Sequence, residues 1–158
     1  MKRSPKIRLI DEKIVKNNFP TSTIDTHKYL KGNVLVFGGK IPGASRLTAL
    51  AARKVGAGLS TIYLPKKYLK YYPYVEPGTI INCDKKINLL KFSSMVIGPG
   101  LGLKFKKKKI LNNIKNKLPV IIDADALSIF KSNPRSLFAE LMKKNNSVLT
   151  PHHGEFKR

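Results

Sequence analysis

The 158-residue sequence is poor in cysteine, in acidic side chains and in long apolar runs. Its single cysteine, Cys83, excludes an intrachain disulfide framework and a metal site built from several cysteines. No apolar run reaches the roughly 18–20 residues of a membrane span. The basic N-terminus is not followed by the apolar stretch of a secretory signal. These absences predict a cytoplasmic protein with no membrane partner.

Because acidic side chains are scarce, the chain has a formal net charge of +22, from 31 Lys and Arg residues and nine Asp and Glu residues. Such a charge favours nonspecific binding of polyanions, so a basic nucleic-acid-binding α/β protein is one interpretation. Only six of the basic residues are arginine, and the basic–aromatic pattern typical of RNA-binding sheets is missing. We therefore expect no specific nucleic-acid partner.

The densest lysine run, residues 104–109, is followed by apolar residues at helical spacing. Leu111, Ile114 and Leu118 would form the buried stripe of a helix, and the lysines would form its solvated face. The run therefore predicts an amphipathic surface helix rather than a polyanion site.

Short apolar runs alternate with helical patterns along most of the chain. We expect strands at residues 33–37, 59–64, 79–82, 94–97, 119–122 and 147–149. We expect helices at residues 43–55, after the lysine run, at 126–131 and at 137–143. Residues 66–74 are ambiguous, and residues 1–26, which carry Pro5 and Pro20, predict an irregular linker. Continuous apolar strands that alternate with helices predict an α/β protein whose parallel sheet is covered on both faces.

Four of the expected strands end in glycines or charged groups. The segments that follow them are residues 38–45 (GGKIPGAS), 98–102 (GPGLG), 123–125 (DAD) and 150–155 (TPHHGE). Ligands of open parallel sheets bind outside the carboxyl ends of the strands. We therefore expect these segments to converge on one edge of the sheet and to form a ligand site there.

The glycine-rich segments do not match the common nucleotide-binding motifs. Gly38 and Gly43 have Walker A spacing, but Ala44 stands where the lysine belongs, and no GxGxxG is present. A glycine turn that leads into a helix N-terminus would still suit an anion or a polar ligand edge. Gly100 and Gly102 would let a ligand approach the backbone closely. A tight turn without a ligand is the alternative for both segments.

The polar segments leave alternatives open as well. Asp123 and Asp125 could hold magnesium or bind the hydroxyls of a phosphate-bearing ligand, or Asp125 could cap the helix that follows. A zinc site at His152 and His153 is not expected, because adjacent histidines point apart and no third ligand has suitable spacing. One of these histidines is predicted to hydrogen-bond a ligand instead.

In this order, the motifs resemble those of the ADP- or ATP-dependent NAD(P)H-hydrate dehydratase family, a branch of the ribokinase-like superfamily. The matching segments are residues 27–32, 34–65, 97–102, 120–127 and 148–156. The resemblance implies a three-layer α/β/α ribokinase-like fold with a mainly parallel sheet. The segments HKYLKG (residues 27–32) and GASRL (residues 43–47) resemble those of family members in which an NAD(P)H-hydrate epimerase domain precedes the dehydratase domain. Residues 1–26 would then be a linker, and residues 27–158 the N-terminal part of the dehydratase domain.

Members of this family repair hydrated nicotinamide cofactors, and the resemblance implies the same activity here. ADP or ATP, with Mg²⁺, phosphorylates the hydroxyl of the S-form of NAD(P)H hydrate, and loss of phosphate regenerates NAD(P)H. The resemblance implies a homo-oligomer for the full-length protein. Another ribokinase-like small-molecule kinase is the alternative within the same superfamily.

The resemblance also assigns site residues. Those implied to contact the hydrate are Ala44, Gly100, Gly102 and His152. Those implied to organise magnesium or phosphate are Asp123, Asp125 and Glu155. None of them is expected to form a metal site built by the protein alone.

One departure from the family concerns catalysis. Relatives continue well past the TPHHGEF motif, into a nucleotide-binding lysine loop and a GTGD turn whose aspartate is the catalytic base. No GTGD is present in this sequence. We therefore expect a fold that is incomplete at the C-terminus and a chain that is inactive alone.

Overall fold

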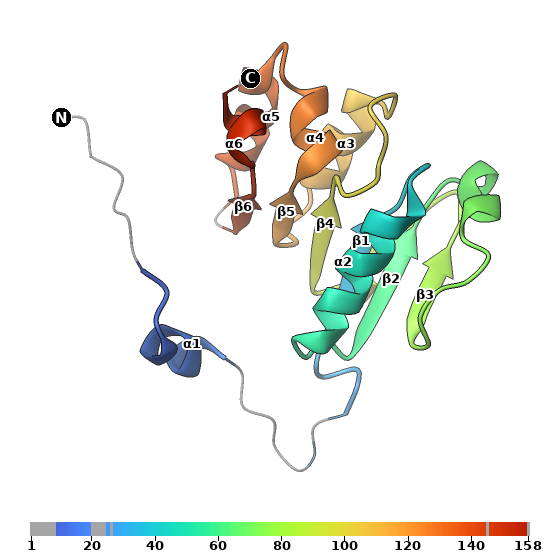
Figure 1. Cartoon of the computed structure of the whole chain (residues 1–158), viewed down its shortest axis with the longest axis vertical. Helices are drawn as coiled ribbons and strands as arrows, with labels where there is room; N and C mark the ends of the chain where they lie inside the picture. Colours follow the sequence, from blue (N-terminus) through green and yellow to red (C-terminus); the bar gives the residue numbers. More distant parts are fainter. Residues whose placement is uncertain (1–8, 20–24, 26, 145, 158) are drawn as a thin grey trace.

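A six-stranded parallel sheet forms the centre of the computed structural model, which describes residues 9–19, 25, 27–144 and 146–157. The strands lie in the order β3-β2-β1-β4-β5-β6 (Figure 1). Their bounds are β1 Asn33–Phe37, β2 Leu59–Tyr63, β3 Thr79–Asn82, β4 Ser94–Ile97, β5 Val120–Ile122 and β6 Ser147–Leu149. Every neighbouring pair is parallel. The parallel α/β fold expected from the sequence is therefore confirmed.

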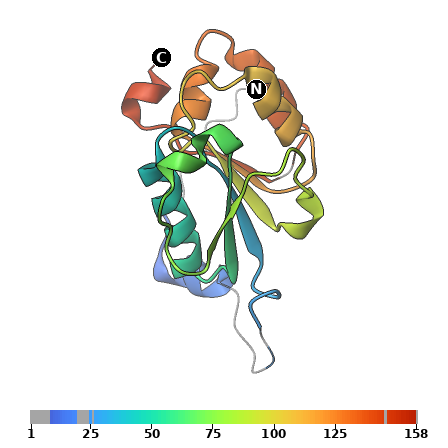
Figure 2. The ribbon, with the colours of Figure 1, turned by 90° about the vertical axis from the view of Figure 1, so that its right-hand side faces the viewer.

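Helices cover both faces of this sheet. Their bounds are α1 Glu12–Asn18, α2 Pro42–Lys54, α3 Lys107–Ile114, α4 Ala124–Ile129, α5 Pro134–Leu141 and α6 His153–Phe156, with 3-10 helices η1 Lys66–Tyr71 and η2 Leu89–Lys91. Helix α2 crosses one face, and α3, α4 and α5 pack on the other. Figure 2 shows α2 and the gold α3 on opposite sides of the strands. These layers confirm the three-layer α/β/α arrangement.

The core follows the alternation of side chains along the central strand. Leu35 and Phe37 of β1 point into the cluster formed with α3, α4 and α5, whereas Val36 points towards α2. The α2 layer does not extend over the far strands, because Ile121 of β5 and Val148 of β6 are 39% and 54% exposed on that face. On the opposite face, Ile80 of β3, which lies on the same side as Leu35, is 45% exposed, so cover is partial at the outer strands of both faces.

The register of the strands aligns their carboxyl ends. Phe37 pairs with Ile97, Ile97 with Ile122, and Ile122 with Leu149. The segments that begin at residues 38, 98, 123 and 150 therefore leave the sheet side by side at one edge. This confirms the convergence that the strand ends predict.

The N-terminal segment differs in part from its prediction. Residues 12–18 form helix α1, not irregular chain, because the Asp11 carboxylate caps it by accepting a hydrogen bond of 2.8 Å from the Ile14 N–H. The helix lies apart from the sheet in Figure 1. The rest of residues 1–26, except residues 9–11, 19 and 25, lies outside the described part of the chain.

The lysine-rich helix is shorter than the pattern suggested. Helix α3 ends at Ile114, and its buried residues are Ile110 and Ile114. Leu118 lies beyond the helix but still packs against the same core. In the described ranges, no helix has the length and apolarity that a bilayer crossing requires.

Candidate active site

The two glycine segments interlock at the edge of the sheet. The Ile41 N–H donates a hydrogen bond of 3.2 Å to the Gly100 carbonyl oxygen. A Cβ atom on Gly100, which has a φ of +68°, would lie 2.1 Å from the Ile41 carbonyl oxygen. A Cβ atom on Gly39 would lie 2.1 Å from the carbonyl oxygen of Leu101. Both positions therefore require glycine, because the backbones of the two loops touch there.

Ala44 lies in the first turn of α2, directly beside this junction. A Cβ atom on Gly100 would be 3.4 Å from the Ala44 Cβ, so the two residues face each other. Pro42 occupies the start of the helix, and Ile41 at the N-cap contributes no capping side chain. The first-turn N–H groups of α2 thus present the positive end of the helix dipole next to a small side chain. This arrangement suits a polar or anionic edge of a ligand.

The aspartates that follow β5 have separate roles. An oxygen of Asp125 accepts a hydrogen bond of 2.8 Å from the Gly102 N–H, so this carboxylate anchors the second glycine loop. The alternative in which Asp125 caps α4 is wrong, because Asp123 occupies the N-cap. Within the described residues, Asp123 makes no side-chain capping bond. Its carboxylate is therefore the less constrained of the two.

The histidine and glutamate that follow β6 are paired with each other. His152 caps α6: its Nδ1 accepts from the Gly154 N–H at 3.0 Å, and its own N–H donates to Glu155 at 3.1 Å. Since Nδ1 is an acceptor, Nε2 carries the proton, and it lies 3.4 Å from the other Glu155 oxygen. The His152 side chain is 69% exposed, which leaves it accessible, whereas that of Glu155 is only 9% exposed.

A buried tyrosine that the sequence did not single out supports the first glycine loop. The Tyr72 hydroxyl lies 2.8 Å from Ser45 Oγ, accepts from the Gly39 N–H at 3.2 Å and lies 3.1 Å from the Gly39 carbonyl oxygen. It is 5% exposed. Tyr72 belongs to residues 66–74, whose sequence pattern is ambiguous. Its role is evident only from the contacts that its hydroxyl group makes in the structure.

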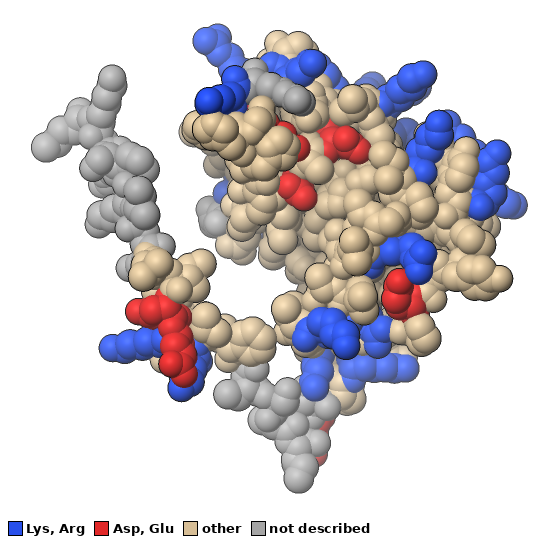
Figure 3. Space-filling model, viewed as in Figure 1, with Lys and Arg blue, Asp and Glu red and all other residues tan. Residues whose placement is uncertain are grey.

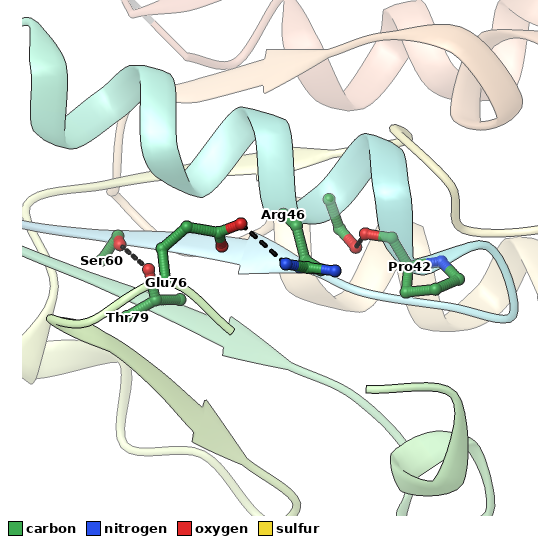
Figure 4. Close-up of polar contacts among 6 residues, drawn as sticks. Pro42, Arg46, Ser60, Glu76 and Thr79 are labelled. Carbon is green, nitrogen blue, oxygen red and sulfur yellow. Dashed lines mark hydrogen bonds and ion pairs between the residues drawn. The ribbon is translucent and has the colours of Figure 1, made fainter. Parts of the chain in front are cut away.

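An ion pair ties α2 to the loop before β3. Arg46 lies 2.8 Å from Glu76, and the hydroxyls of Ser60 and Thr79 lie 3.3 Å apart nearby (Figure 4). Hydrogen bonding to its own backbone N–H and to Arg46 holds the pKa of Glu76 below its ordinary value, although burial opposes this. The pair therefore anchors the helix whose first turn carries Ala44.

The described residues do not fit a magnesium site built by the protein alone. Among them, no three His, Cys, Asp or Glu side chains are grouped closely enough to hold a metal ion. Asp125 is bound to Gly102, and Glu155 is bound to His152. Two of the three candidate carboxylates are therefore already engaged by the protein itself.

Comparisons with known proteins agree with this arrangement. The profile of the NAD(P)H-hydrate dehydratase family matches residues 34–158. The bifunctional NAD(P)H-hydrate repair enzyme Nnr of Coxiella burnetii is 34% identical over 96% of this chain and 31% of its own length. The ATP-dependent (S)-NAD(P)H-hydrate dehydratase of Danio rerio is 32% identical over 92% of this chain and 48% of its own. The chain thus spans slightly less than a third of the first relative and slightly less than half of the second.

A solved structure supports the fold assignment. The ADP/ATP-dependent NAD(P)H-hydrate dehydratase of Bacillus subtilis, co-crystallised with ATP and Mg²⁺, superposes with a TM-score of 0.71 and 26% identity. The match covers 94% of this chain and 54% of that one. These matches favour the dehydratase interpretation over the nucleic-acid-binding and other kinase alternatives. This chain belongs to the NAD(P)H-hydrate dehydratase family.

Proposed function

We propose that this chain forms the hydrate-binding part of an ADP- or ATP-dependent NAD(P)H-hydrate dehydratase that acts on the S-form of the hydrate. The observation that carries the proposal is the interlocked pair of glycine loops beside Ala44, at the edge where the strands end. The family membership supports the same substrate class.

The residues around the glycine junction are proposed to bind the hydrated ring. Ala44 and Gly102 are partly exposed and present a methyl group and backbone, so the hydrated ring could approach them closely, whereas Gly100 is buried and is proposed to support this contact surface from beneath. Asp125 keeps Gly102 in place through its hydrogen bond and is a positioning residue. His152, whose side chain is 69% exposed, is proposed to contact the hydrate.

The reaction proposed for the whole enzyme has two stages. The terminal phosphoryl group of the nucleotide is transferred to the hydroxyl oxygen of the hydrate, and the hydroxyl proton is taken by a base. The carbon–oxygen bond then breaks and phosphate leaves, while the neighbouring ring carbon loses a proton and the double bond of NAD(P)H is restored. Asp123 is the carboxylate proposed to organise the phosphate or a Mg²⁺ ion that arrives with the nucleotide, and Glu155 is proposed to act through its pairing with His152.

The proposal also covers the domain organisation, location and oligomeric state of the whole enzyme. Residues 1–26 are proposed to be a linker and residues 27–158 the N-terminal part of a dehydratase domain. Some relatives are bifunctional repair enzymes, which supports fusion to an epimerase domain. A cytoplasmic location and a homo-oligomer of the whole enzyme are proposed on the family resemblance.

Binding of hydrated NADH to the chain tests the proposal. Ala44→Leu would place a larger side chain against Gly100 and should weaken binding of the S-hydrate at least about tenfold, measured by calorimetry. Gly43→Ala is the matched control, because no described atom lies within 4 Å of the added Cβ. Equal affinities for both variants would contradict the placement of the hydrate at Ala44.

A further inference from the structure

A cavity of about 670 Å³ lies on the face of the sheet opposite α2. Its floor is formed where β1, β2 and β3 end, and its far wall is formed by α3. Gly38, which begins the first glycine loop, also lines this cavity. The cavity therefore borders the candidate active site but extends away from it, over residues that the site does not use.

The floor of this cavity is aromatic. Phe37 and Tyr63 pack edge to face, with ring centroids 5.6 Å apart and an interplanar angle of 85°. The Tyr63 hydroxyl donates a hydrogen bond of 3.1 Å to the Asp84 carbonyl oxygen, which fixes the ring. Phe105 adds a third aromatic ring to the lining. A planar ligand would find apolar ring surface here.

The mouth of the cavity is basic. Lysines reach it from three separate segments: Lys66 after β2, Lys85 and Lys86 after β3, and Lys109 from α3. Among the described residues of the lining, Asp84 is the only acidic one, and its carboxylate accepts a hydrogen bond of 3.0 Å from the Asn82 amide. The excess of positive charge would attract an anion to the rim.

The deeper titratable groups are uncharged at neutral pH. Burial, followed by the nearby Asp84 charge, raises the pKa values of Tyr63 and Cys83 above their ordinary values, although Lys66 opposes the shift at Cys83. The cavity thus combines a neutral interior, lined by aromatic and aliphatic side chains, with a cationic rim.

We propose that this cavity binds a mononucleotide unit, with its base on the aromatic floor and its phosphate at the lysines. The volume lies within the range of about 300–1,000 Å³ that is typical of small-molecule sites. Lysine binds phosphate as a point charge and needs no fixed planar geometry. The unit could be a free nucleotide or, if the proposed function holds, the adenylate half of the dinucleotide substrate, since Gly38 lines this cavity and begins the loop that leads to Ala44.

The first test compares two charge-matched double variants by calorimetry with AMP. Lys66→Gln with Lys109→Gln removes two lining lysines, and Lys67→Gln with Lys108→Gln removes their chain neighbours, which do not line the cavity. The first variant should bind AMP at least about tenfold more weakly, and the second should bind within about twofold of the wild type. Adenosine and inorganic phosphate should each bind more weakly than AMP. Equal losses in both variants, or phosphate binding as tight as AMP binding, would overturn the proposal.

Alkylation of Cys83 gives a second readout of location. The single cysteine of the chain lines the cavity, so bound AMP should slow its reaction with N-ethylmaleimide several-fold at pH 8. The protection should be lost in the Lys66→Gln, Lys109→Gln variant and kept in its control. An alkylation rate that saturating AMP leaves unchanged would place the nucleotide elsewhere.

Competition identifies the source of the nucleotide unit. If the adenylate half of the substrate occupies the cavity, NADPH should also protect Cys83 and should displace AMP. If the site takes a free nucleotide, AMP alone should protect. Ala44→Leu should leave AMP protection intact, so a failure of the proposed hydrate site and a failure of this nucleotide site are distinguishable.

Discussion

At the scale of single residues, glycine positions are the most tightly constrained part of the site. Gly39→Ala would drive a Cβ atom into the Leu101 carbonyl oxygen, 2.1 Å away, and backbone cannot yield as a side chain can. We expect a loss of about 1–3 kcal/mol in the free energy of unfolding, measured by urea denaturation. Gly43→Ala, with open space around the added atom, should change it by less than about 0.5 kcal/mol. Equal effects would mean that the loops do not touch at Gly39.

The Arg46–Glu76 pair predicts a pH dependence of stability. The pKa of Glu76 is lowered in the folded state, so its contribution is present above the ordinary carboxyl value of 4.5 and is lost as pH falls through the folded value. Glu76→Gln should cost about 1 kcal/mol at pH 7, since both side chains are partly exposed. The cost should shrink towards zero near pH 3.

An exposed ion pair is the control for this experiment. Glu12 lies 2.7 Å from Lys16, but their side chains are 79% and 73% exposed, so Glu12→Gln should have little effect at either pH. A Glu76→Gln variant whose stability loss is the same at pH 7 and pH 3 would show that packing, not charge, carries its effect.

The sequence predicted those parts of the site in which the backbone requires a particular residue type, such as glycine. Clustered glycines after β1 and β4 indicated two loops at one edge of the sheet, although not their contact at Gly39 and Gly100. The sequence offered Asp125 as a possible cap of α4, but its carboxylate accepts from the Gly102 N–H, 23 residues away along the chain, and Asp123 occupies the N-cap without a capping bond. The sequence did not reveal Tyr72, whose partner Gly39 is 33 residues away along the chain.

At the scale of elements, the strands were predictable and the helix ends less so. A strand buried on both faces is a continuous apolar run, and the runs of β1 and β4 stop at Gly38 and Gly98, so the bounds of these two strands match the pattern. Helix α1 carries a largely polar sequence, and its start depends on the single cap at Asp11. Helix α3 ends before Leu118 although the apolar spacing continues. Periodicity identifies a buried stripe, but it does not say where the helical backbone stops.

At the scale of the whole molecule, the two signs of charge are distributed differently. In Figure 3, basic side chains are spread around the outline of the visible face, whereas acidic ones are few. Asp123, Asp125 and Glu155 all follow strands at the same edge of the sheet. The distribution agrees with the interpretation of the lysines as solvated surface and of the carboxylates as part of the site.

The carboxylates of this edge lead to a prediction about turnover. General-base catalysis contributes about 10²–10⁴-fold to a rate, and it needs a carboxylate or imidazole that is free to take the hydroxyl proton. Asp125 is bound to Gly102, and His152 and Glu155 are bound to each other, so of these carboxylates Asp123 is the least engaged. The family resemblance places the base in a GTGD motif, which this sequence does not contain. The 158-residue chain assayed alone should therefore bind the S-hydrate but not convert it with ATP or ADP and Mg²⁺. The measurement is recovery of the absorbance of the reduced nicotinamide, with the Bacillus subtilis dehydratase as a positive control.

Turnover by the chain alone would contradict this prediction and would require a base among its own residues. Asp123 would then be the first candidate, because its carboxylate makes no capping bond in the described chain. Asp123→Asn keeps the size of the side chain and removes its basicity, so it should abolish such turnover and leave hydrate binding within about twofold. Asp125→Asn should act differently: it weakens the acceptor for the Gly102 N–H, so it should loosen hydrate binding as well. The pair of variants therefore separates a residue that takes a proton from one that holds the glycine loop in place.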